Sequence, residues 1–222
     1  MKLLLIRHGD PNYEADCLTD KGKKQAEFLS QRLILTEQIQ EIYTSPMGRA
    51  IQTAQFTAEK LNLELRILPW LHEFAVTMPV PYQDTPDYPF TLRADYWNSI
   101  CNSRDPDHSN ILHTGVLERI QVIEQSFQLF LESYGLKKDG YLFRIVDSHK
   151  FDGRTIAMFC HAGISGLLLS LLLNVPILPF WNTISIPTTG VSSIQIERIE
   201  PKSTHAHIII PYIGDTMHLY HT

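Results

Sequence analysis

The chain has 222 residues, a length that suits one medium-sized domain or one domain carrying a lid. Hydrophobic residues make up 44% and charged residues 19% of the chain, ordinary globular values that argue against wholesale disorder. The formal net charge is -5 at pH 7, so composition gives no reason to expect nucleic acid or an anionic membrane as partner. Any anionic ligand would have to be held by a few locally gathered arginines.

The cysteines and the apolar runs indicate a cytoplasmic protein without a membrane anchor. Cys17, Cys101 and Cys160 form no CxxC pair and leave an odd one, so neither a disulfide framework nor a zinc site is expected. The apolar run at residues 1–6 is too short for a signal peptide. The longest apolar stretch, residues 167–173, is far too short to span a membrane.

The first third of the chain alternates strand and helix patterns. Residues 3–6 are an apolar run typical of a strand buried on both faces, and Thr19 offers the N-cap of a following helix. Residues 41–44 and 65–68 predict two further strands, and helical spacing of small and apolar residues fills positions 49–61. This order predicts an α/β fold of three layers, α/β/α, around a mostly parallel central sheet.

Residues 76–113 have a different texture, with five prolines, frequent aromatic residues and no regular period. A structureless stretch of this length inside a compact domain is unusual unless it has a function. We interpret it as a lid inserted between the third strand and the next helix, with a short helix near residues 92–100. The competing interpretation is a surface insertion that is merely tolerated.

Regular patterns return after the insertion, and we expect residues 1–222 to form a single domain. The pattern predicts a long amphipathic helix over 116–130, an edge strand or hairpin at 141–146, an apolar strand at 155–160, an apolar helix over 164–173, and strands at 191–196 and 206–210.

Two histidines occupy equivalent places in this scheme. His8 follows the first predicted strand, and His161 follows the strand at 155–160. In open α/β sheets, ligands bind in the crevice beyond the carboxyl ends of the strands. If the two strands are neighbours, both histidines face one crevice. The small residues Gly9 and Ala162 would let a bulky anion approach the backbone there, and the N–H groups of the helix that begins after His161 favour an anion.

Further short motifs accompany Arg7-His8-Gly9 along the chain. They are Leu18-Thr19 with Gly22 and Gln25-Ala26, Tyr43-Thr44-Ser45-Pro46 with Arg49-Ala50, Gln52-Thr53-Ala54, Leu71-His72-Glu73, and Phe159-Cys160-His161-Ala162-Gly163. In this order and at these spacings they resemble the histidine phosphatase superfamily, the phosphoglycerate mutase-like enzymes. The resemblance covers the framework at both ends of the chain but not residues 76–113.

The resemblance implies phosphoryl transfer through a phosphohistidine on His8, with no metal ion or other cofactor. Phosphoryl transfer spreads negative charge over the equatorial oxygens, so positive charge and positioning dominate its catalysis. Arg7 and Arg49 would clamp these oxygens with their forked guanidinium donors, and a protonated His161 would add a donor opposite. Glu73 would give a proton to the leaving oxygen and then take one from the incoming water.

Each of these assignments has a competing structural interpretation. Arg7 and His8 would also suit an ion cluster at a strand end, Arg49 would also suit a solvent-facing helix position, and His161 would also suit a helix cap. The identity of the acid is open as well: Glu73 stands where the family often carries it, but Asp10 or Asp84 could serve.

Two residues complete the expected substrate site. Ala162 would contribute as the small residue at the start of the helix after His161. Asn12 is a candidate phosphate contact, because some relatives carry an asparagine shortly after the histidine, and a solvated loop is the equal alternative. The sequence departs from the family pattern at Asp10-Pro11, where the family usually has Glu or Gln followed by Thr or Ser. Pro11 restrains the loop and puts a hydroxyl contact from that position in doubt.

The leading interpretation is a phosphatase acting on a small phosphorylated substrate. The alternative is phosphoryl transfer of the phosphoglycerate mutase type, and a third, weaker one is a non-catalytic binder of a phosphorylated ligand or a protein partner. Arg93 and Arg104 of the insertion could meet a second anionic group of the substrate. The sequence leaves open the physiological substrate and the oligomeric state, and a homodimer is one possibility.

Overall fold

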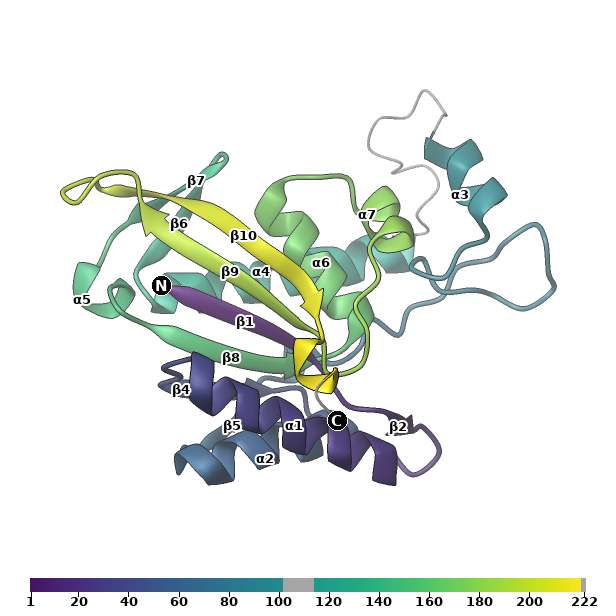
Figure 1. The fold of residues 1–222 in the computed structure, drawn as a ribbon. Coiled ribbons are helices and arrows are strands. Elements are labelled where there is room, and N and C mark those ends of the chain that lie inside the picture. The colour runs from purple at the N-terminus through teal and green to yellow at the C-terminus, as the bar shows by residue number, and fades with distance from the viewer. Residues whose placement is uncertain (102–113, 221–222) are drawn as a thin grey trace.

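A computed structural model of the protein describes residues 1–101 and 114–220, and the fold is drawn in Figure 1. The strands are β1 (Lys2–Arg7), β2 (Pro11–Asn12), β3 (Cys17–Leu18), β4 (Glu41–Thr44), β5 (Leu65–Ile67), β6 (Leu136–Asp139), β7 (Leu142–Ile145), β8 (Thr155–Cys160), β9 (Val191–Arg198) and β10 (His205–Asp215). The helices are α1 (Asp20–Thr36), α2 (Gly48–Leu61), α3 (Ala94–Cys101), α4 (Thr114–Ser133), α5 (Ser148–Phe151), α6 (Ala162–Leu173) and α7 (Ile177–Thr183), with short 3₁₀ turns η1 (Pro69–Leu71) and η2 (Met217–Leu219).

One large sheet organises the fold, in the strand order β5-β4-β8-β1-β9-β10-β7-β6. The first four of these strands are parallel, and each later strand is antiparallel to its neighbour. Six of the eight strands described in this sheet therefore run in one direction. The predicted α/β class with a mostly parallel sheet is confirmed. The antiparallel half consists of β9, β10 and the hairpin of β7 and β6, of which β6 was not predicted.

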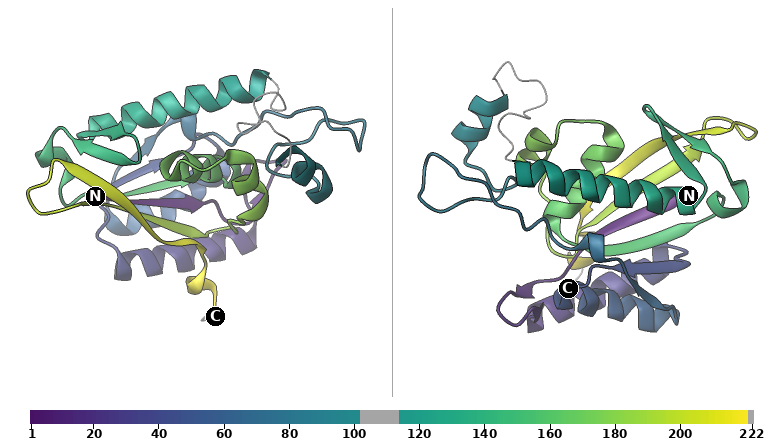
Figure 2. Two further views of the ribbon diagram at one scale, coloured as in Figure 1. Left: turned by 90° about the horizontal axis from the view of Figure 1, so that it is seen from above. Right: turned by 180° about the vertical axis from the view of Figure 1, so that it is seen from behind.

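The two faces of the sheet bury different side chains of the same strands. Along β1, Leu3 and Leu5 lie in the larger core with α4 and α6, and Leu4 and Ile6 lie in the smaller core with α1 and α2. Figure 2 shows α4 on the side of the sheet opposite to α1 and α2. Because β1 is covered on both faces, its residues form a continuous apolar run, as the sequence predicted.

The predicted helices and strands are present where the patterns placed them. Thr19 caps α1 and accepts a hydrogen bond from the Gly22 N–H at 3.0 Å. Helix α7 was not predicted, because Pro176 and Pro179 interrupt the pattern. Pro179 is tolerated because it falls in the first turn, where N–H groups have no partner inside the helix. Within the described parts of the chain, no helix combines the length and the apolar character that a membrane span requires.

The insertion begins at the end of the sheet where β1 and β8 terminate, and it extends past α7 (Figure 1). Met78 and Asp87 form an isolated antiparallel bridge, and α3 lies close to the predicted short helix and packs against α7. The Leu92 N–H donates to the Asn182 side chain at 3.1 Å, which fastens the insertion to α7. Arg104, and with it the second part of the predicted lid, lies outside the described residues. Its action as a lid stays a prediction.

Candidate active site

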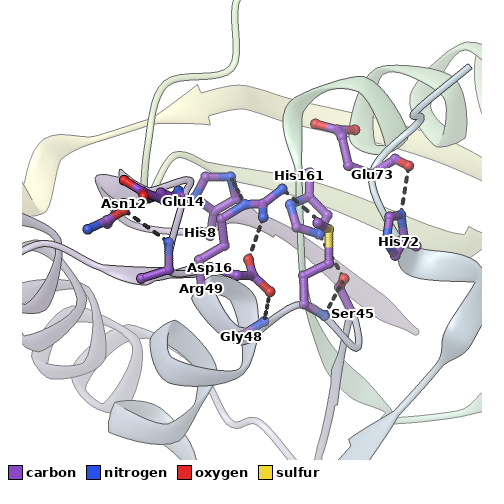
Figure 3. A network of polar contacts seen from close by, with 12 residues as sticks. His8, Asn12, Glu14, Asp16, Ser45, Gly48, Arg49, His72, Glu73 and His161 are labelled. Carbon is purple, nitrogen blue, oxygen red and sulfur yellow. Dashed lines mark hydrogen bonds and ion pairs between the residues drawn. The ribbon is translucent and has the colours of Figure 1, made fainter. Parts of the chain in front are cut away.

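Three neighbouring strands end together and carry the polar residues of the site. In the parallel pair β1 and β8, Arg7 lies opposite Cys160, so His8 and His161 are the next residue of each strand. In the pair β4 and β8, Thr44 lies opposite Phe159, which brings Ser45 to the same edge. The two histidines therefore lie side by side, as expected for neighbouring strands, and Figure 3 shows them together with Arg49.

His8 is almost fully buried, with 2% of its surface exposed, and its ring centroid lies 5.1 Å from that of His161. Its Nδ1 is 2.7 Å from the carbonyl oxygen of Gly9, so Nδ1 carries the proton and Nε2 is left with a lone pair. Arg49 Nε donates to that Nε2 at 3.3 Å. Burial, and then the nearby Arg49 and Arg7, lower the pKa of His8 to about 4. At neutral pH the ring is therefore uncharged, and the lone pair of its Nε2 points away from the Gly9 backbone.

His161 is fully buried, and its Nε2 lies 2.7 Å from Ser45 Oγ. Burial, followed by His8 and Arg49, lowers the pKa of His161 to about 2. Burial, together with the nearby arginines, thus disfavours a protonated His161 before an anion binds, and its protonation beside a bound substrate stays a prediction. A phosphoryl dianion between the two histidines would reverse this balance by favouring the charged ring.

The two arginines approach the site from different elements. Arg7 ends β1, and its Nη1 donates to the carbonyl oxygen of Ile186 at 2.7 Å. Arg49 lies in the first turn of α2 with only 5% of its surface exposed. Asp16 accepts hydrogen bonds from the Arg49 guanidinium at 2.5 Å and from the Gly48 N–H at 2.7 Å (Figure 3). The aromatic ring of Tyr13 covers the same guanidinium at 5.3 Å.

Asp16 and Ser45 bond to candidate site residues, Arg49 and His161, and the sequence analysis did not assign them. Asp16 adopts a left-handed backbone conformation, with φ 47°, which turns its carboxylate toward α2. The bonds to Gly48 and Arg49, together with the charge of Arg49, lower the pKa of Asp16 despite the opposing effect of its partial burial. Ser45 is part of the Tyr43-Thr44-Ser45-Pro46 motif. Its closeness to His161 follows only from the pairing of β4 with β8.

Buried polar atoms without a partner gather at this edge of the sheet. Among the described residues, three buried side-chain nitrogens or oxygens lack a hydrogen-bond partner, and two of them are Arg7 Nε and His161 Nδ1. An unsatisfied buried polar group costs free energy comparable to a lost hydrogen bond. Such atoms beside a buried imidazole pair offer unused hydrogen-bonding capacity to an anion.

Glu73 lies at the N-terminus of α6. Its Oε1 accepts from the N–H groups of Phe74 at 2.8 Å and Ile164 at 3.0 Å, and its Oε2 accepts from Gly163 at 3.3 Å. The N–H groups expected to bind an anion at this helix therefore already serve a carboxylate of the chain itself. Oε2 accepts only the one long bond among these, and it is the oxygen with capacity left for a substrate.

The other candidates are exposed or bonded within their own loops. Asn12 is exposed, and its Oδ1 accepts from the N–H groups of Glu14 and Ala15 at 3.1 Å, which is the local bonding of a solvated loop (Figure 3). Asp10 accepts from the Thr19 hydroxyl at 2.7 Å, and Asp84 is exposed in the insertion. The bonds of Asn12 leave only its side-chain amide nitrogen to donate to a phosphate.

The buried histidines predict a loss of stability in acid. Burial is the largest cause that lowers the pKa from 6.5 to about 4 for His8 and His218 and to about 2 for His161. Below pH 6.5 the unfolded chain binds more protons than the folded protein does. The unfolding free energy is therefore highest above that pH and falls as the pH drops toward 4. We expect chemical denaturation to show an unfolding free energy lower at pH 5 than at pH 7 by on the order of 1–2 kcal/mol per histidine.

The His218→Gln variant supplies the control for this prediction. His218 lies outside the crevice, with Nε2 3.0 Å from Thr189 Oγ1 and Nδ1 3.4 Å from Arg32 Nη1. The variant should lose less stability than the wild type over the same pH interval. Equal losses in the two proteins would contradict the assignment of His218 to this group.

Comparison with known proteins gives a family for the first part of the chain. A model of the histidine phosphatase superfamily (branch 1) matches residues 3–78. Phosphoserine phosphatase 1 of Hydrogenobacter thermophilus is 36% identical over 74 residues, which are 29% of this chain and 35% of that protein. Phosphoglycerate mutase-like protein 4 of Arabidopsis thaliana is 31% identical over 68 residues, which are 27% of this chain and 30% of that protein. The matches thus span about a third of these relatives.

Solved structures extend the likeness to nearly the whole chain at the level of the fold. A phosphoserine phosphatase from Entamoeba histolytica, determined with phosphoserine, superposes with a TM-score of 0.64 at 18% identity and covers 98% of both chains. A mycobacterial glucosyl-3-phosphoglycerate phosphatase gives a TM-score of 0.59 at 18% identity, over 96% of this chain and 98% of the other. The superfamily match over residues 3–78, which include His8, and the fold shared with these phosphatases over nearly the whole chain support the histidine phosphatase superfamily.

Proposed function

We propose that the protein is a phosphatase that hydrolyses a small phosphomonoester through a phosphohistidine on His8, without a metal ion. The single observation that carries the proposal is the arrangement at the ends of β1 and β8. There the uncharged His8 ring lies 5.1 Å from His161, with Arg49 beside its Nε2. Arg7 and the backbone at Ala162 complete the site that would hold the phosphoryl group.

In the first step, His8 Nε2 attacks phosphorus and forms a P–N bond while the P–O bond to the alcohol breaks. The electron pair goes to the alcohol oxygen, which takes a proton from Glu73. Arg7, Arg49 and His161 donate hydrogen bonds to the phosphoryl oxygens as their charge grows. The two-step route replaces one difficult displacement by two easier ones.

In the second step, water attacks the phosphorus of the phosphohistidine and gives a proton to Glu73. The P–N bond breaks, its electron pair returns to His8 Nε2, and inorganic phosphate leaves. A bound phosphorylated intermediate that reclaims the phosphoryl group would instead give a mutase, and the names of the curated relatives include both activities. The geometry of His8, Glu73 and the arginines serves either outcome.

A panel of phosphomonoesters, with 3-phosphoglycerate among them, tests the proposal. We expect phosphate release from at least one ester, unaffected by a chelator, and rapid quenching should trap an acid-labile, alkali-stable phosphoprotein during turnover. Free phosphate from 3-phosphoglycerate indicates hydrolysis, and 2-phosphoglycerate indicates transfer. No phosphate release and no trapped phosphoprotein with any ester would contradict the proposal and favour a binding protein.

A further inference from the structure

A cavity of about 440 Å³ opens beside the phosphoryl site, within the range of small-molecule pockets. Its walls come from the insertion, the start of α6, α7 and the segment after α7. Its lining includes Arg7, Phe90, Gly163, Trp181, Asn182 and Ser185.

The charge of this cavity is low. Arg7 is the one charged residue among the described residues that line it, and Arg7 already donates to the Ile186 carbonyl at 2.7 Å. Arg93, the arginine of the described part of the insertion, is exposed, pairs with Asp95 and covers the Tyr82 ring at 4.9 Å. Neither arginine is thus placed to meet a carboxylate in the cavity while Arg7 holds a phosphoryl group.

The apolar wall is firmly held. Trp181 Nε1 donates to the Gly163 carbonyl at 2.8 Å, and the Trp181 ring lies against Gly166, where an added Cβ would come within 2.6 Å of it. Phe90 packs edge-on against Trp181, with 6.0 Å between the ring centroids. Asn182 uses its amide within the wall, accepting from Leu92 and donating to the Pro89 carbonyl at 2.9 Å.

The acid and the apolar wall meet at one residue. An added Cβ on Gly163 would lie 2.8 Å from Glu73 Oε1 and 2.8 Å from Phe90 Cε1, so both side chains approach the same α-carbon. An alcohol oxygen protonated by Glu73 therefore has the Phe90 and Trp181 wall next to it. The group attached to that oxygen would lie along this wall.

We infer that the substrate is the phosphate ester of an uncharged alcohol that carries an apolar group about the size of an aromatic ring. The inference rests on the proposed function and names the substrate class of the same site. Transfer of an apolar group onto the aromatic wall is favourable, whereas a carboxylate would be desolvated there with no cation besides Arg7 among the described lining residues. Phosphoserine and 3-phosphoglycerate both carry a carboxylate.

The test compares esters whose alcohols are equally poor leaving groups. 2-Phenylethyl phosphate and O-phosphoserine are both primary alkyl esters, so differences in kcat/KM report on the cavity and not on leaving-group chemistry. We expect kcat/KM for 2-phenylethyl phosphate to exceed that for O-phosphoserine and for 3-phosphoglycerate by about 10- to 200-fold. Ethyl phosphate should fall between them, because it lacks both the apolar body and the charges.

A variant that adds a cation to the wall makes the test specific. Ser185 lines the cavity and is exposed, so Ser185→Lys should be tolerated, and Ser185→Met is the matched uncharged control. Ser185→Lys should shift the ratio of the two kcat/KM values toward O-phosphoserine by about 10-fold, since an opposite charge now faces the carboxylate. Ser185→Met should leave the ratio within about 3-fold of wild type.

The possible outcomes separate this inference from the proposed function. If the wild type hydrolyses O-phosphoserine or 3-phosphoglycerate as well as 2-phenylethyl phosphate, the substrate class is wrong while the phosphatase reaction stands. If Ser185→Lys and Ser185→Met change the ratio equally, the charge argument is wrong. If no ester is hydrolysed and no phosphoprotein forms, the proposed function fails and the substrate class with it.

Discussion

The His8→Ala variant is expected to hydrolyse every phosphomonoester at least about 10⁴-fold more slowly than the wild type, because it lacks the nucleophile of both chemical steps. Arg7 and Arg49 are unchanged in this variant and would still hold the substrate, so substrate binding should change far less than kcat. The measurements are steady-state phosphate release and trapping of the phosphoprotein, which should vanish in the variant.

His149→Ala provides the matched control for this substitution, since His149 is exposed on α5 and has no place in the crevice. It should keep wild-type turnover and a trapped phosphoprotein. A His8→Ala protein that is folded and still forms an acid-labile phosphoprotein would show that another residue accepts the phosphoryl group. His161 would then be the first candidate, because its ring lies 5.1 Å from that of His8.

The sequence predicted those parts of the fold in which a local pattern coincides with burial. Strand β1 is buried on both faces and is a continuous apolar run, and Thr19 both caps α1 and begins its pattern. Strand β6 was missed because Lys137 and Lys138 give it a charged pattern, which is usual for an edge strand whose outer side faces water. Helix α7 was missed because its prolines hide a helix that packing stabilises.

In the candidate site, too, the residues that could be predicted are those marked by a local sequence pattern. His8 and His161 could be named from sequence because each directly follows an apolar strand, and their meeting depends only on the adjacency of β1 and β8. Asp16 and the bonds of Glu73 could not be predicted, because they depend on partners at sequence separations of 33 and 91 residues. Loop conformation and helix placement decide such contacts, and neither leaves a local pattern in the sequence.

The Glu73→Gln variant is expected to separate substrates by their leaving groups. An alkyl alcohol needs a proton as it departs, so hydrolysis of 2-phenylethyl phosphate should slow by about 10²- to 10³-fold without the acid. 4-Nitrophenolate leaves unprotonated, so the rate of the first step with 4-nitrophenyl phosphate, read from the initial burst of 4-nitrophenolate, should change by less than about 5-fold. The second step is common to both esters and slows for both, because Glu73 also takes the proton of the attacking water. The comparison within one variant controls for structural damage, since a displaced α6 would slow both esters alike.

The position of Glu73 makes this control necessary. Its carboxylate accepts from three backbone N–H groups, and a glutamine can offer an acceptor to only some of them. A small loss of thermal stability is therefore expected together with the kinetic effect. If Glu73→Gln hydrolyses 2-phenylethyl phosphate at the wild-type rate, the acid is another group. Asp10→Asn would be the next variant to measure, because Asp10 lies two residues beyond the nucleophile and its carboxylate already bonds the Thr19 hydroxyl at 2.7 Å.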